Sequence, residues 1–129
     1  MDIKFRLWIE KEEKHVAGKG GVAILKAIDE EASISGASKK LGMSYRYVWG
    51  YIKKMEKAVG KVVESEKGGS GGGRTVLTER GKEIVRLYEF YENLVKKLGK
   101  GEFERVIIRE GEVIPRIEDG DYVLIKLDY

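Results

Sequence analysis

The chain has 129 residues, of which 42% are hydrophobic and 36% are charged, and its formal net charge is +3 at pH 7. It has no cysteine and one histidine, which excludes disulfides, thiolate metal sites and a histidine-rich metal cluster. No apolar run approaches the roughly 18 residues of a membrane span, and the first residues lack the apolar centre of a signal peptide, so we expect a cytoplasmic protein of one domain with at most a small appendage.

The first expected elements are a strand and a helix. Residues 3–9 are mostly apolar with some alternation, which predicts a strand. Residues 18–21 are rich in glycine and break the chain, so His15 just before them is expected in a loop. Residues 22–31 carry apolar side chains at helical spacing, which predicts the first helix.

A short helix, a tight turn and another helix follow. Ser33 is a favourable N-cap for the short helix over residues 34–41. Gly42 is expected to end that helix, because glycine tolerates the left-handed conformation of a tight turn. Ser44 is then positioned to cap the next helix. This arrangement is the helix-turn-helix pattern of many DNA-binding proteins.

The helix after Ser44 has two distinct faces at 100° per residue. Its apolar stripe is expected to be buried and consists of Val48, Ile52, Met55 and Val59. The opposite face is basic and contains one small residue: Arg46, Gly50, Lys53 and Lys57. Glycine within a helix costs about 1 kcal/mol relative to alanine. Close approach to a phosphate backbone would explain Gly50, and a tolerated defect at an exposed position is the alternative.

Aromatic residues alternate along the same helix at Tyr45, Tyr47, Trp49 and Tyr51. Tyr51 lies near the apolar stripe and is expected in the core. Tyr45 lies at the N-terminal end, where recognition helices contact DNA. Trp49 lies on the flank, and the sequence leaves open whether it contacts DNA or packs against the preceding helix.

A glycine-rich hairpin comes next. Residues 62–65 and 75–77 are short strands around the run at residues 68–73, with Lys67 and Arg74 at its base. This run resembles a phosphate-binding P-loop, but a P-loop must lead into a helix, and here a strand follows. We therefore expect a DNA-contacting wing and no nucleotide hydrolysis. No set of nucleophile, base and acid is evident elsewhere, so we expect no enzyme activity, cofactor or metal.

A long helix over residues 78–98 is expected next, with Thr78 as its cap. Its apolar positions follow steps of three and four, close to a heptad seam. We interpret this seam as partly core and partly dimer interface: Ile84, Leu87, Tyr88, Tyr91, Leu94, Val95 and Leu98. Residues 99–129 then form a short β appendage, too small for its own core, which is expected to pack on the main domain or on the partner subunit.

Positive charge is concentrated in one part of the chain. Residues 33–78 hold nine basic and three acidic residues, whereas residues 1–32 and 79–129 have small negative charges of −1 and −2. A local excess of +6 around the helix-turn-helix and wing favours a polyanionic partner. The high Lys and Glu content, with no Gln and a single Asn, is typical of a thermophile and says nothing of function.

Particular motifs resemble one known family. Residues 33–35, 40–46 and Trp49, with the glycine wing and the segment Leu77-Thr78-Glu79-Arg80-Gly81, are similar to the N-terminal DNA-binding domain of ModE-type, molybdate-responsive regulators. The resemblance covers about residues 3–98. It implies a winged helix-turn-helix related to that of LysR-type regulators, which dimerises and binds an operator. Members carry C-terminal oxyanion-binding domains, and residues 101–129 are too short for one, so molybdate or tungstate binding is not expected.

The sequence thus predicts an α+β, mainly helical fold, a winged helix-turn-helix that binds duplex DNA as a homodimer and regulates transcription. Ser44, Tyr45 and Arg46 are expected at base edges. Most of the lysines are expected at phosphates, and the wing is expected to lie along the DNA. The full set of expected DNA-binding residues is Ser33, Ser35, Lys39, Lys40, Ser44, Tyr45, Arg46, Trp49, Gly50, Lys53, Lys57, Lys67, Gly69, Ser70, Gly71, Gly72 and Arg74. Two alternatives stay open. One is a dimerisation module without sequence readout, and the other is an oxyanion-responsive regulator whose site would use tail residues Arg105, Arg109, Arg116 and Lys126.

Overall fold

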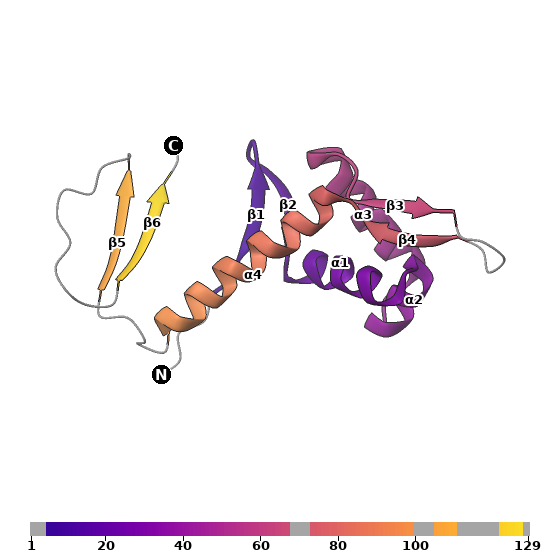
Figure 1. The fold of residues 1–129 in the computed structure, drawn as a ribbon, viewed down its shortest axis with the longest axis horizontal. Helices are drawn as coiled ribbons and strands as arrows, with labels where there is room; N and C mark the ends of the chain where they lie inside the picture. Colours follow the sequence, from indigo (N-terminus) through magenta and orange to yellow (C-terminus); the bar gives the residue numbers. More distant parts are fainter. Residues whose placement is uncertain (1–4, 68–72, 100–104, 111–121, 128–129) are drawn as a thin grey trace. The chain divides into compact units, whose positions relative to one another are not determined.

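The computed structural model describes residues 5–67, 73–99, 105–110 and 122–127 (Figure 1). The chain divides into one unit of residues 2–91 and a second unit that comprises Met1 and residues 92–129. Each unit is described by itself. The larger unit contains two β-hairpins, three helices and most of a fourth helix.

An N-terminal hairpin opens the larger unit. Strand β1 (Trp8–Lys11) pairs antiparallel with β2 (Lys14–Gly18) through a two-residue turn. The strand expected over residues 3–9 therefore begins later, and the expected loop at His15 is wrong, because His15 lies in β2. Both turn residues, Glu12 and Glu13, have positive φ, of 50° and 64°. Turns of this type normally carry glycine or asparagine, which is why the sequence did not indicate this hairpin.

Helix α1 (Lys19–Glu31) forms the centre of the core, with Ile24, Leu25 and Ile28 fully buried. It begins three residues before the expected start at Val22, because the glycines of its first turn adopt helical conformation. A side chain at Gly21 would lie 2.6 Å from the ring of Tyr51, so this glycine admits the tyrosine of another helix.

Helices α2 (Ile34–Leu41) and α3 (Tyr45–Val59) confirm the expected helix-turn-helix. Ser33 Oγ accepts a hydrogen bond from the Gly36 amide at 2.7 Å, and Ser44 Oγ accepts one from the Tyr47 amide at 3.1 Å. The turn between the helices contains Gly42 at φ 63°, the left-handed conformation expected of it. Three of the four stripe residues of α3, Val48, Ile52 and Met55, are buried, while Val59 is half-buried.

The second hairpin is the wing. Strands β3 (Val63–Glu66) and β4 (Arg74–Leu77) pair antiparallel with Glu66 opposite Arg74 at the open end. The two hairpins lie at opposite ends of the larger unit in Figure 1. The wing is tied to α1 through a hydrogen bond of 2.9 Å from the Thr75 amide to the carbonyl of Ala32. The glycine tip at residues 68–72 lies outside the described residues.

Helix α4 (Glu79–Gly99) begins at the expected cap, since Thr78 Oγ1 accepts a hydrogen bond from the Gly81 amide at 3.1 Å. The apolar residues of its seam differ in burial. Ile84 and Tyr88 are buried in the core of their own domain, so their assignment to the dimer interface is corrected. Leu87 and Tyr91 remain exposed. Leu94 and Val95 are half-buried, and the side chain of Leu98 lies outside the described residues.

The smaller unit contains β5 (Arg105–Glu110) and β6 (Tyr122–Leu127), which pair in parallel with Arg105 opposite Tyr122. The apolar runs at 106–108 and 122–125 thus lie in strands as expected, while the connecting residues, including the turn signal at 118–121, lie outside the described residues. Within the described residues, no helix is long and apolar enough to cross a membrane, and no cluster of His, Cys, Asp or Glu could hold a metal ion.

Candidate nucleic-acid interface

The outer face of α3 carries the expected basic and aromatic side chains. Arg46, Gly50, Lys53 and Lys57 are all exposed, opposite the buried stripe. Tyr45 and Tyr47 at the start of the helix are exposed by 53% and 55%. Exposed apolar surface that gathers in one patch is typical of an interaction site. The face therefore combines positive charge with flat hydrophobic surface, a combination suited to a polyanion.

Trp49 is partly exposed at the surface, and its contact with DNA stays a prediction. Its side chain is 46% exposed, and the Lys53 ammonium lies 5.4 Å from the ring centroid. A cation at this distance is attracted by the electrons of the indole ring. Tyr51, by contrast, is half-buried and packs against the core, as expected.

Several of the predicted phosphate-binding cations are paired with carboxylates. Lys40 hydrogen-bonds to Glu30 and lies 3.7 Å from Glu31. The hydrogen bond from Lys40 lowers the pKa of Glu30, and the same bond raises the pKa of Lys40, so both groups stay charged at neutral pH. Lys53 lies 3.4 Å from Glu56, and Arg74 lies 3.3 Å from Glu66 across the wing. These exposed pairs are weak, yet each adds negative charge beside its cation.

The remaining predicted residues take different positions. The hydroxyl groups of Ser33 and Ser44 serve as helix caps, and Ser33 is half-buried. Ser35 and Lys39 on α2 are exposed, as are Lys57 at the end of α3 and Lys67 at the base of the wing. The wing residues Gly69, Ser70, Gly71 and Gly72 lie outside the described residues.

A hollow of about 370 Å³ on the surface of α3 was not predicted. Its lining comes from α3 and from the N-terminal hairpin: His15, Arg46, Tyr47, Gly50, Tyr51 and Lys54. Lys54 could have been found from the sequence, because it lies two turns after Arg46 on the same side of the helix. His15 could not, because its strand was missed. Here its Nε2 lies 3.2 Å from the hydroxyl of Tyr51.

Comparison with known proteins shows what this region is similar to. Residues 21–82, which run from α1 to the start of α4, match the family model of bacterial regulatory helix-turn-helix proteins of the LysR family. The resemblance drawn from the sequence motifs is confirmed, because ModE-type proteins are also among the relatives of this chain.

Three curated relatives match stretches of this chain. ModE of Escherichia coli K12, a DNA-binding transcriptional dual regulator, is 32% identical over 98 residues, which cover 75% of this chain and 37% of that protein. MopB of Rhodobacter capsulatus, a molybdenum-pterin-binding protein, is 37% identical over 82 residues, covering 63% and 30%. ModE of Azotobacter vinelandii, a molybdenum transport protein, is 32% identical over 101 residues, covering 78% and 34%. The chain spans about a third of the length of these relatives.

Solved structures are similar to this chain in fold. A MarR family transcription regulator has a TM-score of 0.53 at 21% identity, covering 68% of this chain and 60% of that chain. A MarR/EmrR family transcriptional regulator from Acinetobacter sp. ADP1 has a TM-score of 0.50 at 24% identity, covering 68% and 63%. The likeness concerns the fold alone, and it confirms the predicted winged helix.

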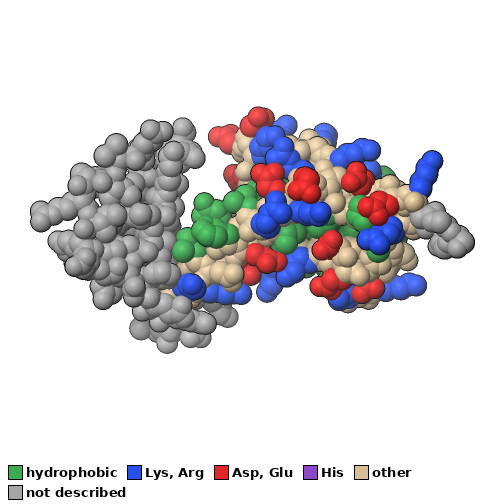
Figure 2. All heavy atoms as spheres, in the orientation of Figure 1, with side chains coloured by type: hydrophobic (Ala, Val, Ile, Leu, Met, Phe, Trp, Pro, Cys, Tyr) green, Lys and Arg blue, Asp and Glu red, His purple; other side chains and the backbone are tan. Residues whose placement is uncertain are grey.

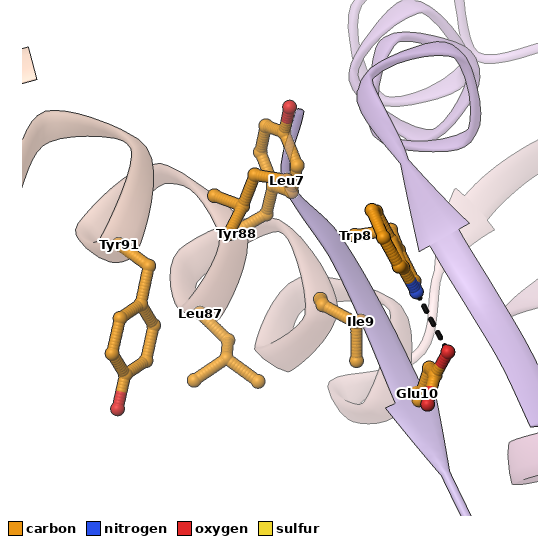
Figure 3. Close-up of a pocket in the computed structure, with 7 residues that line it drawn as sticks. All are labelled: Leu7, Trp8, Ile9, Glu10, Leu87, Tyr88 and Tyr91. Atoms are coloured by element: carbon orange, nitrogen blue, oxygen red, sulfur yellow. Dashed lines mark hydrogen bonds between the residues drawn. The ribbon is translucent and has the colours of Figure 1, made fainter. Parts of the chain in front are cut away.

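The larger unit also carries an apolar groove of about 300 Å³ between β1 and α4 (Figure 3). Leu7 and Ile9 lie on the side of the strand that faces Leu87 and Tyr88, while Trp8 lies on the other side, where its indole N–H donates to Glu10 at 2.7 Å. Hydrophobic side chains gather over α4 beside β1 on the face shown in Figure 2. Large apolar residues with exposed surface here include Trp8, Leu87, Phe90 and Tyr91.

Proposed function

We propose that this chain is a sequence-specific transcriptional regulator that binds duplex DNA as a homodimer. The exposed basic and aromatic face of α3, held by a capped helix-turn-helix and followed by a wing, carries the proposal. A helix of this width fits the major groove of B-DNA, and an extended wing can follow the neighbouring phosphates. The match of residues 21–82 to the LysR-type family model and the similarity to ModE support it. Binding to chromosomal DNA would place the protein in the cytoplasm.

Each element has a proposed role in this complex. Ser44 and Tyr45 lie at the N-terminal end of α3, the part of a recognition helix that reaches base edges. Lys39, Lys57 and Lys67 are exposed cations that can neutralise phosphates. In this proposal residues 1–98 form the DNA-binding domain with its dimerisation helix, and residues 99–129 form an appendage to it.

The groove between β1 and α4 supports the homodimer. Soluble monomers seldom leave several large apolar side chains together in solvent, and Leu87 and Tyr91 are exposed by 42% and 38% on one side of α4. A second copy of the same surface would cover them in a two-fold arrangement. Two copies of α3 would then read two half-sites.

The test is binding-site selection from a random duplex library, followed by titration at several salt concentrations. With about 6–8 phosphate contacts, the slope of log K against log[salt] is expected at roughly −5 to −7. Selected duplexes should bind at least about 1,000-fold more tightly than random duplexes. A flat salt response contradicts DNA binding, and equal affinity for all sequences supports the dimerisation module without sequence readout. Repeating the selection with molybdate tests the oxyanion-responsive alternative.

The ion pairs predict a difference between two exposed lysines. Lys57→Ala is expected to reduce the magnitude of the salt slope by about one, because one phosphate contact and its released counterions are lost. Lys40→Ala is expected to leave the slope unchanged, because Glu30 and Glu31 already balance this charge. The comparison is made by fluorescence anisotropy with the selected duplex. Equal slope changes in both variants would mean that Lys40 leaves its carboxylates when DNA binds.

A further inference from the structure

We propose that the hollow around Gly50 binds a phosphodiester of the DNA backbone, and that α3 and the N-terminal hairpin together form this binding site. This inference rests on the proposed function and deepens it, because it assigns a binding site for the DNA sugar-phosphate backbone to residues that family similarity does not single out. It also changes the role of Arg46, which the sequence placed at base edges.

Gly50 lines this hollow. Apart from its chain neighbours and the backbone of its own helix, no atom of the described structure lies within 4 Å of the position that a β-carbon at Gly50 would take. The glycine therefore serves no internal packing, in contrast to Gly21, whose missing side chain admits the ring of Tyr51. A helix gains stability from alanine at such an open position. The absent side chain instead creates space toward solvent, where a ligand can approach the helix backbone closely.

Two cationic side chains flank Gly50 along α3. Arg46 and Lys54 lie one helical turn before and one turn after Gly50, on the same side of α3. Neither forms an ion pair within the described residues, unlike Lys40, Lys53 and Arg74. Among the residues that the structure describes, no Asp or Glu lines the hollow. Its charge is therefore positive and unbalanced, which suits a phosphodiester.

The walls supply hydrogen-bond donors and a fixed shape. The rings of Tyr47 and Tyr51 meet edge to face, with centroids 6.2 Å apart, and His15 from β2 meets Tyr51 in the same manner at 6.4 Å. The hydroxyl of Tyr51 and Nε2 of His15 lie 3.2 Å apart. These two groups hydrogen-bond to each other, so when Nε2 donates to the phenol oxygen, the Tyr51 hydroxyl is the group that can donate to a phosphate oxygen. A convex sugar-phosphate fits this concave, cationic surface, whereas base reading requires side chains that protrude into the groove.

The decisive experiment compares two glycine-to-alanine variants of the full chain. Gly20 in α1 is the matched control, because it is also helical and exposed, and its β-carbon position has no atom within 4 Å beyond its chain neighbours and its own helix backbone. Both Gly50→Ala and Gly20→Ala are expected to raise the melting temperature slightly. Only Gly50→Ala is expected to weaken binding to the selected duplex, by about tenfold, because its methyl group occupies the space of the phosphodiester.

Two further variants show that the ligand is the backbone. Arg46→Ala and Lys54→Ala should each weaken binding equally on selected and random duplexes, and each should reduce the magnitude of the salt slope by about one. A loss confined to selected duplexes would assign Arg46 to base reading and overturn the inference. Wild-type affinity in Gly50→Ala would also overturn it while leaving the proposed function intact. If the wild-type protein binds no duplex, the result contradicts both this inference and the proposed function.

Discussion

Replacing Gly81 by alanine is expected to lower the free energy of unfolding by about 3 kcal/mol, near the upper end of overpacking effects. A β-carbon at Gly81 would lie 2.3 Å from the carbonyl oxygen of Val62. This neighbour is a backbone atom, so no side-chain rotation can relieve the contact. The same oxygen accepts a hydrogen bond from the Thr78 amide at 3.0 Å, so moving it away would also break the link between the wing and α4.

Gly20→Ala provides the control for this prediction as well. Gly20 and Gly81 both lie in the first turn of a helix, but the position above Gly20 is open. Alanine at Gly20 should stabilise the protein by up to about 1 kcal/mol, through the higher helix propensity of alanine. Chemical denaturation followed by circular dichroism measures both changes. Equal stabilities of the two variants would mean that α4 shifts away from Val62 without cost.

The close contact at Gly81 gives the motif Leu77-Thr78-Glu79-Arg80-Gly81 a physical meaning. Thr78 caps α4 and also donates from Oγ1 to the carbonyl of Lys61 at 2.7 Å, so one threonine binds both the helix and the start of the wing. Gly81 permits the approach that these hydrogen bonds require. The motif sets the position of the wing relative to α4, and it therefore supports DNA contact without reaching the DNA itself.

Features governed by local chemistry could be predicted from the sequence. The caps at Ser33, Ser44 and Thr78 were predicted because the side chain and the amide that it accepts from lie within three residues of each other. Gly42 was predicted for the same reason, since a left-handed residue must follow α2. The two faces of α3 followed from helical periodicity alone.

Features that depend on distant parts of the chain could not be predicted in the same way. The turn at Glu12 and Glu13 carries no glycine or asparagine, so nothing indicated β2 or the contact of His15 with Tyr51. Periodicity placed Ile84 and Leu87 on one seam of α4. It could not show that the core of the same domain buries Ile84 and leaves Leu87 exposed, because that division depends on how β1 packs against the helix.

The exposed part of this seam leads to the prediction with the largest expected effect on assembly. Leu87→Glu is expected to weaken dimerisation by at least about 100-fold, which corresponds to roughly 2.7 kcal/mol. Leu87 lines the groove beside Tyr88 and Tyr91, and a carboxylate there would lose apolar burial and would have to be desolvated without a partner. Because two half-sites need two copies of α3, affinity for the selected duplex should fall as well.

Asn93→Glu is the matched control for Leu87→Glu. It introduces the same side chain and the same change of charge into α4 at an exposed position on the opposite side of the helix from the groove. Sedimentation equilibrium across a range of concentrations should show a monomer for Leu87→Glu and a wild-type dimer for Asn93→Glu. Dimerisation in both variants would place the subunit contact away from the groove, whereas loss in both would indicate that the helix itself, rather than its apolar side, responds to added negative charge. Only a monomeric Leu87→Glu together with a dimeric Asn93→Glu identifies Leu87 and its groove as the surface that joins two copies. That surface would then bring two α3 helices to one operator.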